Sequence, residues 1–331
     1  MKKNITIQDV ANRAGVSKTT ISRYLNGRYG NMSAQTKEKI KNIIEELDYR
    51  PSKQAQGLKL RKSSLIGLLV ADIENLYSAH LIKSSQDALN KTGYQMVIMN
   101  SNNSVEEEQK ALQKLIDQNV DGILLQPVAS NVAAFQMIEE AGIPMVLIDR
   151  TLVGSKWTTV QSNNFQVTKE LTIHLLEKGY EKIVFVSEPI QKIHPRLERL
   201  EGVRVGAMAA NVQVDLLELY DKGKGETIVD YVQKNALIKQ KTAFFAANGT
   251  ALQEIVLGLN RLHLKIPAEC GVCGYDDWFL AELINPGITT IQQQPHRIGE
   301  RSVVALLEEL EAKQPLEKIE IPAQICFRYS L

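Results

Sequence analysis

The chain has few cysteines and no long hydrophobic run. Three cysteines among 331 residues are an odd number and too few for a disulfide framework, so we expect a reducing compartment. The longest apolar runs, such as residues 65–71, are far shorter than the roughly 20 residues that a membrane-spanning helix requires. The first residues, MKKNITIQD, lack the apolar segment of a secretory signal peptide. We therefore expect a cytoplasmic protein.

Two of the cysteines, Cys270 and Cys273, have the CxxC spacing that occurs in metal and redox sites. They lie in the strand-like run ECGVCGYDD, where side chains three residues apart point to opposite faces. The sequence offers no second cysteine pair to complete a metal site. We interpret both as core residues, because free cysteine packs as a small hydrophobic side chain. No metal and no cofactor is expected.

Motifs of several enzyme classes are also missing. The sequence has no GxGxxG after a strand, no GxxxxGK[ST], no GxSxG and no HExxH. The segment GVSKTT at Gly15 lacks the first glycine of a phosphate-binding loop and follows a helix. An α/β enzyme and a transport-type binding protein remain alternatives, although neither explains the charge pattern of the chain.

Charge is distributed unevenly along the chain. Residues 1–63 contain 14 Lys and Arg against 5 Asp and Glu, a net charge of +9. The other residues contain 25 against 33, a net charge of −8. A basic N-terminal segment joined to an acidic body indicates that this segment binds a polyanion.

The N-terminal segment predicts three short helices. Thr6 followed by Asp9 has the spacing of a capping box, Gly15 ends the first helix, and Ser17 can cap the second. The second helix is expected to bury Val16, Thr20, Ile21 and Leu25. It is expected to expose Lys18, Thr19, Ser22 and Arg23. A third helix begins near Ser33 and buries Ile40, Ile43, Ile44 and Leu47. The pattern predicts a helix-turn-helix unit whose second helix fits the major groove of DNA; a small three-helix cap with a basic face is the alternative.

The body alternates between apolar runs and amphipathic stretches. The runs occupy residues 64–72, 95–102, 120–128, 144–150, 182–188, 214–221, 241–248 and 269–277. Amphipathic stretches such as 106–118, 166–178 and 249–262 predict helices between them, so the fold class is α/β with parallel sheets. The segment 288–295 then leads to a helix at 298–311 and a final strand around 319–329. A similar series restarts near residue 164, which predicts two lobes.

The predicted boundaries follow from these patterns. Residues 1–50 form the helix-turn-helix domain, 51–63 the hinge, and 64–331 the body. The first lobe comprises about 64–163 and 291–318, and the second about 164–290 and 319–331.

The run TIQDVANRAGVSKTTISRYLNG resembles the start of lactose repressor-type (LacI/GalR family) transcription regulators, in which D-V-A-x-x-A-G-V-S-x-x-T-x-S-R-x-L-N is usual. YRPSKQAQGLK resembles the hinge of that family, which coils into a helix only on DNA. The likeness continues through VDGILLQP, MVLIDR and GVCGYDDWF. It implies a DNA-binding repressor of a carbohydrate or sugar-acid operon, with a two-lobed sensor similar to periplasmic sugar-binding proteins.

The resemblance also assigns the DNA contacts. Lys18, Thr19 and Arg23 fall on the base-reading positions, and Leu58 matches the leucine that is wedged into the minor groove. Gly57 beside this wedge disfavours the hinge helix by about 1 kcal/mol relative to alanine, and Ser52 replaces the usual Asn. The full set is Thr6, Ser17, Lys18, Thr19, Thr20, Ser22, Arg23, Asn26, Ser52, Ala55 and Leu58.

Polar residues follow several of the predicted strands, where a parallel α/β fold binds its ligands. They are Asp72, Asn102, Asp149, Arg150, Asn248, Asp276 and Asp277. By resemblance, the effector contacts are Ser78, Asn102, Asp149, Arg199, Asn248, Asp276 and Gln293, with Arg150 and Trp278 as further candidates. Ser78, Asn102 and Gln293 are equally explained as helix caps or loop residues, and Trp278 as a packing residue. GYDDW, AANG and LLQP resemble family members that respond to 2-keto-3-deoxygluconate.

The resemblance implies a homodimer that reads a near-palindromic operator and is released by an effector between its lobes. The chain ends at FRYSL without the leucine heptads that make the lactose repressor a tetramer, so we expect a dimer. A corepressor-dependent or catabolite-type regulator, which needs a phosphoprotein partner, is the alternative.

Overall fold

The computed structural model describes residues 5–30, 32–49, 62–190, 193–220, 223, 225–235, 240–276, 280–312 and 318–331. The chain forms two compact units, Met1–Ser64 and Leu65–Leu331. Within the described ranges, no helix combines the length and the apolar character needed to cross a bilayer. Most of the predicted hinge, namely residues 51–61 of 51–63, lies outside them.

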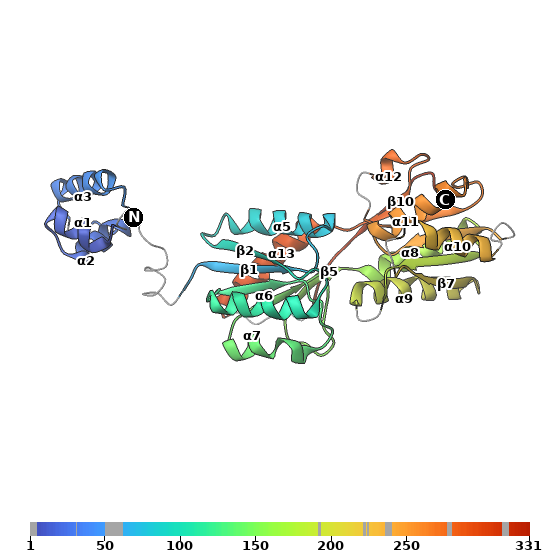
Figure 1. Ribbon diagram of the computed structural model, residues 1–331, viewed down its shortest axis with the longest axis horizontal. Helices are drawn as coiled ribbons and strands as arrows, with labels where there is room; N and C mark the ends of the chain where they lie inside the picture. The colour runs from blue at the N-terminus through green and yellow to red at the C-terminus, as the bar shows by residue number, and fades with distance from the viewer. Residues whose placement is uncertain are drawn as a thin grey trace. The chain divides into compact units, whose positions relative to one another are not determined.

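The N-terminal unit is a bundle of three helices, α1 (Ile7–Ala14), α2 (Lys18–Leu25) and α3 (Ala34–Glu46) (Figure 1). The backbone N–H of Thr6 donates to Asp9 Oδ2 at 2.8 Å, and the Asp9 N–H donates to Thr6 Oγ1 at 3.3 Å, which is the predicted capping box. Gly15 ends α1 with a φ of 67°, a conformation that glycine adopts without strain. The buried core is Val10, Ala11, Ala14, Ile21, Ile40 and Ile43. The helix-turn-helix prediction is confirmed.

The first lobe is built on a sheet of six parallel strands in the order β11-β5-β4-β3-β1-β2. These are β1 (Leu65–Val70), β2 (Gln95–Asn100), β3 (Gly122–Leu125), β4 (Met145–Ile148), β5 (Thr159–Ser162) and β11 (Lys318–Ile321). Helices α5 (Leu76–Leu89) and α13 (Pro295–Leu310) pack on one face. Helix α6 (Val105–Asp117), the short helix Val132–Phe135 and α7 (Gln136–Ala141) cover the other.

The second lobe repeats this architecture with the order β12-β10-β9-β8-β6-β7, in which only β12 is antiparallel to its neighbour. The strands are β6 (Lys182–Ser187), β7 (Gln213–Glu218), β8 (Thr242–Ala246), β9 (Gly271–Tyr275), β10 (Thr289–Gln292) and β12 (Gln324–Cys326). Helices α8 (Asn164–Glu177) and α9 (His194–Met208) cover one face. Helices α10 (Glu226–Asn235), α11 (Gly249–Arg261) and α12 (Leu280–Leu283) cover the other. The α/β fold class is confirmed.

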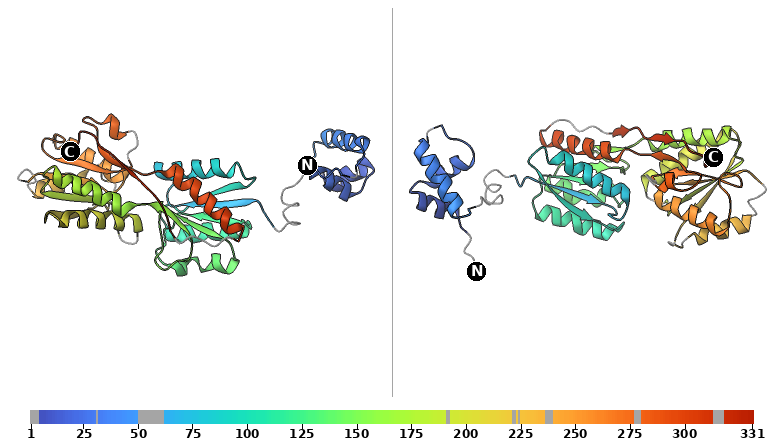
Figure 2. Two further views of the ribbon diagram at one scale, coloured as in Figure 1. Left: turned by 180° about the vertical axis from the view of Figure 1, so that it is seen from behind. Right: turned by 90° about the horizontal axis from the view of Figure 1, so that it is seen from above.

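The chain crosses between the lobes after β5, after β10 and after β11, and these connections run between the sheets in Figures 1 and 2. Two details differ from the prediction. The expected single strand at 319–329 is two strands in different lobes, because Pro322 lacks the N–H that a continuing strand needs. Residues 319–321 therefore belong to the first sheet, and residues 291–292, at the end of β10, to the second.

The two cysteines of the CxxC lie on opposite faces of the second sheet. Cys270 packs in the cluster that contains α11 residues, and Cys273 in the cluster that contains α8 residues. Burial raises the pKa of the Cys270 thiol to about 12. Both are structural core residues.

Close packing of α5 on α13 depends on Gly299. A methyl carbon at this position would collide with Ser84 Oγ and lie 3.0 Å from the Leu81 carbonyl oxygen. We expect Gly299→Ala to lower the free energy of unfolding by about 1–3 kcal/mol through overpacking, measured by denaturant titration. Val304→Ala, on an exposed position of the same helix, should change it by less than about 0.5 kcal/mol. Equal stability of Gly299→Ala and the wild type would contradict this packing.

Candidate functional site

The exposed face of α2 carries the residues predicted to read DNA. Lys18, Thr19 and Arg23 are exposed, and Ser22 is half-buried. Within the described residues, the first three side chains make no hydrogen bond or ion pair, so their polar groups are available to a ligand. The face is basic, because Lys18 and Arg23 lie on it without an acidic residue of α2.

Three other candidates have structural roles in the same unit. Ser17 Oγ accepts from the Thr20 N–H at 3.1 Å and caps α2, Thr6 caps α1, and Asn26 Nδ2 donates to the Ser22 carbonyl oxygen at 2.7 Å. The bonds of Ser17 and Asn26 fix the start and the end of α2. Ser52, Ala55 and Leu58 lie outside the described residues.

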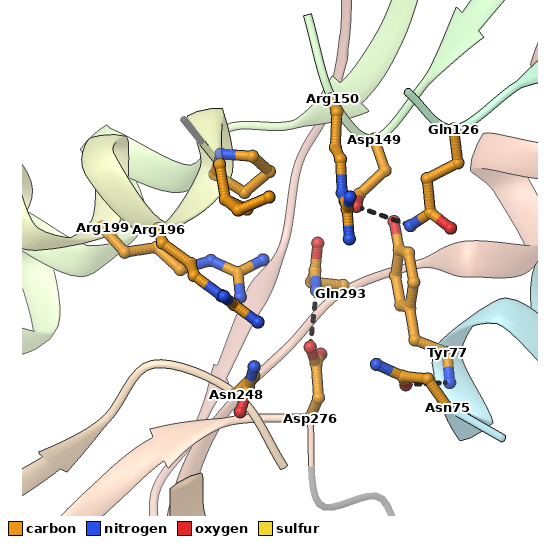
Figure 3. A pocket seen from close by; sticks show the side chains of 12 residues that line it. Asn75, Tyr77, Gln126, Asp149, Arg150, Arg196, Arg199, Asn248, Asp276 and Gln293 are labelled. Carbon is orange, nitrogen blue, oxygen red and sulfur yellow. Dashed lines mark hydrogen bonds between the residues drawn. The ribbon is translucent and has the colours of Figure 1, made fainter. Parts of the chain in front are cut away.

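A polar cavity of about 50 Å³, partly open to solvent, lies between the two lobes of the body (Figure 3). Its lining comes from both lobes and from one crossing segment. The lining residues are Asn75, Tyr77, Gln126, Asp149, Arg150, Ile193, Pro195, Arg196, Arg199, Asn248, Asp276 and Gln293.

The first lobe contributes the residues that follow β3 and β4. Gln126 Nε2 donates to Asp149 Oδ2 at 3.0 Å, and Gln126 Oε1 accepts from the Ala71 N–H at 3.1 Å, so the amide is fixed in one orientation. Asp149 is only 7% exposed, and its Oδ1 accepts no hydrogen bond within the described part of the chain. Burial, together with the charge of Asp149, raises the pKa of Tyr77 well above its usual value. Tyr77 is therefore a neutral donor beside the Asp149 carboxylate.

The second lobe contributes a buried arginine from α9. Arg199 Nε donates to Asn164 Oδ1 at 2.9 Å, and its Nη1 donates to the Ala247 carbonyl oxygen at 2.7 Å. Its guanidinium lies 3.8 Å from the centroid of the Tyr275 ring. Arg199 is thus held rigidly before any ligand is bound.

Asp276 and Gln293 connect the cavity to the crossing segments. Gln293 Nε2 donates to Asp276 Oδ2 at 2.7 Å, and Gln293 Oε1 accepts from Ser162 Oγ at 2.8 Å. Ser162 ends β5 of the first lobe, whereas Asp276 follows β9 of the second. This chain of bonds couples the position of Asp276 to the junction of the lobes.

Most of the predicted effector residues meet in this cavity. They are Asp149, Arg150, Arg199, Asn248, Asp276 and Gln293. Asn248 also caps α11 and donates from Nδ2 to Glu188 Oε2 at 2.9 Å. Asp277 and Trp278 lie outside the described residues.

Two predicted effector residues are not in the lining. Asn102 is exposed in the turn after the edge strand β2, where its Oδ1 accepts from Asn100 Nδ2 at 2.6 Å. Ser78 is buried and donates to Gln126 Oε1 at 3.4 Å, so it supports the lining from behind. Asn102 lies outside the lining because β2 is at the edge of the sheet, and Ser78 because it lies on a side of α5 that does not face the cavity. The local sequence indicates neither feature.

Sequence reasoning also missed four polar lining residues, namely Asn75, Tyr77, Gln126 and Arg196. Gln126 follows an apolar run and carried the same strand-end signal as Asp149. Arg196 lies three residues before Arg199, so both fall on one face of α9. Asn75 and Tyr77 gave no comparable signal, because only the tertiary structure places the start of α5 at the cavity.

No group of three or more His, Cys, Asp or Glu side chains in the described ranges is placed to hold a metal ion. The cavity lining instead offers amides, carboxylates and guanidinium groups, which suit the hydroxyl and carboxylate groups of a small polar molecule.

Comparisons with known proteins agree with this architecture. Residues 6–52 match the model of bacterial regulatory proteins of the lacI family, and residues 172–331 match that of a periplasmic binding protein-like domain. The chain is 38% identical to the HTH-type transcriptional regulator KdgR of Bacillus subtilis (strain 168), over 98% of this chain and 97% of the relative. It is 31% identical to the probable HTH-type transcriptional regulator EndR of Paenibacillus polymyxa, over 93% and 92%. In fold it matches a lac repressor dimer bound to operator and the anti-inducer ONPF, with a TM-score of 0.87 and 22% identity over 99% of each chain.

Proposed function

The chain belongs to the LacI family of bacterial regulatory proteins and is a DNA-binding transcription regulator, and from this premise we propose how its two units work together. A homodimer represses a carbohydrate or sugar-acid operon in the cytoplasm by binding a near-palindromic operator through α2. A small molecule in the cavity between the lobes then releases it. The observation that carries this proposal is that both lobes and a crossing segment contribute to one cavity.

Ligand and operator affect each other through the lobe junction. A ligand that contacts Asp149 of the first lobe and Asp276 of the second changes how the lobes pack, and the change passes through Gln293 and Ser162 to the crossing segments. By linkage, the operator weakens ligand binding by the same factor as the ligand weakens operator binding. A ligand that acts as a corepressor reverses the sign of this coupling.

We propose 2-keto-3-deoxygluconate as the effector. Its hydroxyl groups suit the carboxylates and amides of the lining, and its carboxylate suits the arginines. The lining contains three arginines and two aspartates, a net charge of +1. The sequence resemblance to regulators that respond to this sugar acid points to the same ligand.

The operator half of the proposal is tested by fluorescence anisotropy with DNA from upstream of the gene or its neighbours. Binding should prefer this DNA to scrambled duplex and weaken steeply with salt. Arg23→Ala should lower the specific affinity about 10- to 100-fold, as expected for the loss of a base contact.

Arg13→Ala is the matched control, because Arg13 lies on α1 and its 62% exposed side chain pairs with Glu46. It should change specific affinity by less than threefold. No preference for any upstream fragment, or equal effects of the two substitutions, would contradict α2 as the reading helix.

A further inference from the structure

Three guanidinium groups face the same cavity from the two lobes. Arg150 follows β4 of the first lobe, whereas Arg196 and Arg199 lie on α9 of the second (Figure 3). Arg199 is committed to the protein through Asn164, Ala247 and Tyr275. Arg196 makes as many hydrogen bonds to the protein as Arg199, including an ion pair with Glu188, and Arg150 makes fewer.

Arg150 and Arg196 are anchored at one edge and keep further N–H donors. Within the described residues, the Arg150 side chain donates one hydrogen bond, from Nη1 to the Pro127 carbonyl oxygen at 3.1 Å. Arg196 donates from Nη1 to the Pro189 carbonyl oxygen at 3.0 Å and from Nη2 to Glu188 Oε1 at 2.8 Å. A guanidinium has five N–H donors, so each retains donors that bond to no residue in the described part of the chain.

The charges of these two arginines act on each other across the cavity. Burial lowers the pKa of Arg150, the charge of Asp149 acts in the opposite direction, and the charge of Arg196 lowers the pKa further. Burial likewise lowers the pKa of Arg196, with the paired Glu188 acting in the opposite direction and Arg199 in the same direction as burial. Two like charges held from opposite lobes repel each other, whereas an anion between them attracts both lobes.

We infer that Arg150 and Arg196 together bind the carboxylate of a sugar-acid effector, and that this bridge between the lobes makes the regulator respond to acids rather than to neutral sugars. The inference rests on the proposed function and adds which two residues bind the carboxylate and select acids over neutral sugars. Asp149, Asn248 and Asp276 then bind the hydroxyl groups that acids and neutral sugars share. Selectivity therefore depends on the two arginines, whereas affinity for the rest of the ligand does not.

The test uses a pair of ligands that differ only at this group. 2-Keto-3-deoxygluconate carries a carboxylate at C1, and 3-deoxy-D-fructose carries a hydroxymethyl group there. Titration calorimetry on the full-length protein should give a wild-type preference for the acid of about 100-fold or more, since hydrogen bonds between charged groups are the strong ones. Arg150→Gln and Arg196→Gln should each weaken binding of the acid about 10- to 100-fold and leave binding of the neutral analogue unchanged within threefold.

Further variants and ligands make the result decisive. Arg196→Lys keeps the charge without the planar guanidinium. Its affinity for the acid should lie between that of the wild type and that of Arg196→Gln. Arg13→Gln, on α1, should leave both affinities unchanged. 2-Ketogluconate, gluconate and glucuronate are titrated in parallel, so that the class of ligand is tested as well as one member of it.

Equal wild-type affinity for the acid and the neutral analogue would overturn the inference, as would an equal loss of both in the two glutamine variants. A response to neutral sugars alone, or to none of the acids, would also overturn it. Operator binding by the same preparation decides separately whether the proposed regulator function stands.

Discussion

Replacing Asp276 by alanine is expected to abolish the rise in Tm that the sugar-acid effector gives the wild-type protein. Asp276 follows β9 and accepts from Gln293 Nε2 at 2.7 Å, which holds its carboxylate at the cavity. A carboxylate that accepts two sugar hydroxyls contributes about 1.5–3 kcal/mol for each bond. Losing both should weaken binding about 100-fold or more, measured by thermal shift at a fixed ligand concentration.

Two variants separate a ligand contact from a general loss of structure. Asp276→Asn keeps the shape and one acceptor and should retain part of the Tm rise. Asp72→Ala removes another carboxylate that follows a strand, but Asp72 accepts from the Glu74 N–H and Asn103 Nδ2 and is not part of the lining. It should respond as the wild type does. A full Tm rise in Asp276→Ala would show that the ligand does not contact this residue.

Replacing Glu108 by alanine should cost about 3 kcal/mol or more of the free energy of unfolding. Glu108 on α6 is completely buried, and its two oxygens accept from the N–H groups of Val128 at 2.5 Å and of Ala129 at 3.0 Å. Alanine leaves both buried donors unpaired, each at a cost of about 1–3 kcal/mol. The same bonds hold the segment that carries Gln126, so binding of the effector should weaken as well. Denaturant titration and calorimetry measure the two effects.

Glu107→Ala provides the control on the same helix. Glu107 is 48% exposed and pairs with Lys110 at 2.9 Å, and such surface pairs contribute about 0–1 kcal/mol. The free energy of unfolding of Glu108→Gln should lie between those of the wild type and Glu108→Ala, because an amide oxygen still accepts one of the two bonds. If Glu108→Ala unfolds at the same denaturant concentration as Glu107→Ala, the carboxylate does not hold the segment after β3.

The local sequence was sufficient to predict the structural features that depend on one short segment. The capping box of Thr6 and Asp9, the left-handed Gly15 and the cap at Ser17 depend on residues three apart or closer, so the two helices of the reading unit could be placed from sequence. Continuous apolar runs likewise identified strands that are buried on both faces, such as β1 and β8.

The local sequence did not reveal a strand whose buried side chains are mostly polar. Strand β5 went unrecognised because Thr159, Gln161 and Ser162 carry no hydrophobic signal, yet all three are buried. Their partners come from distant segments, with Gln161 donating to Glu198 and Ser162 to Gln293. No spacing within the strand encodes such bonds.

The sequence by itself determined the helix-turn-helix unit, the parallel α/β class and the strand-end positions of Asp149, Asn248 and Asp276, because each follows from the order of neighbouring residues. Only the tertiary structure decided that Tyr77 and Arg196 reach the cavity, that Asn102 does not, and that residues 318–326 are divided between the lobes. These outcomes depend on which strands lie at the sheet edges and on where the chain crosses between the lobes. Contacts between residues far apart in the chain set both of these features.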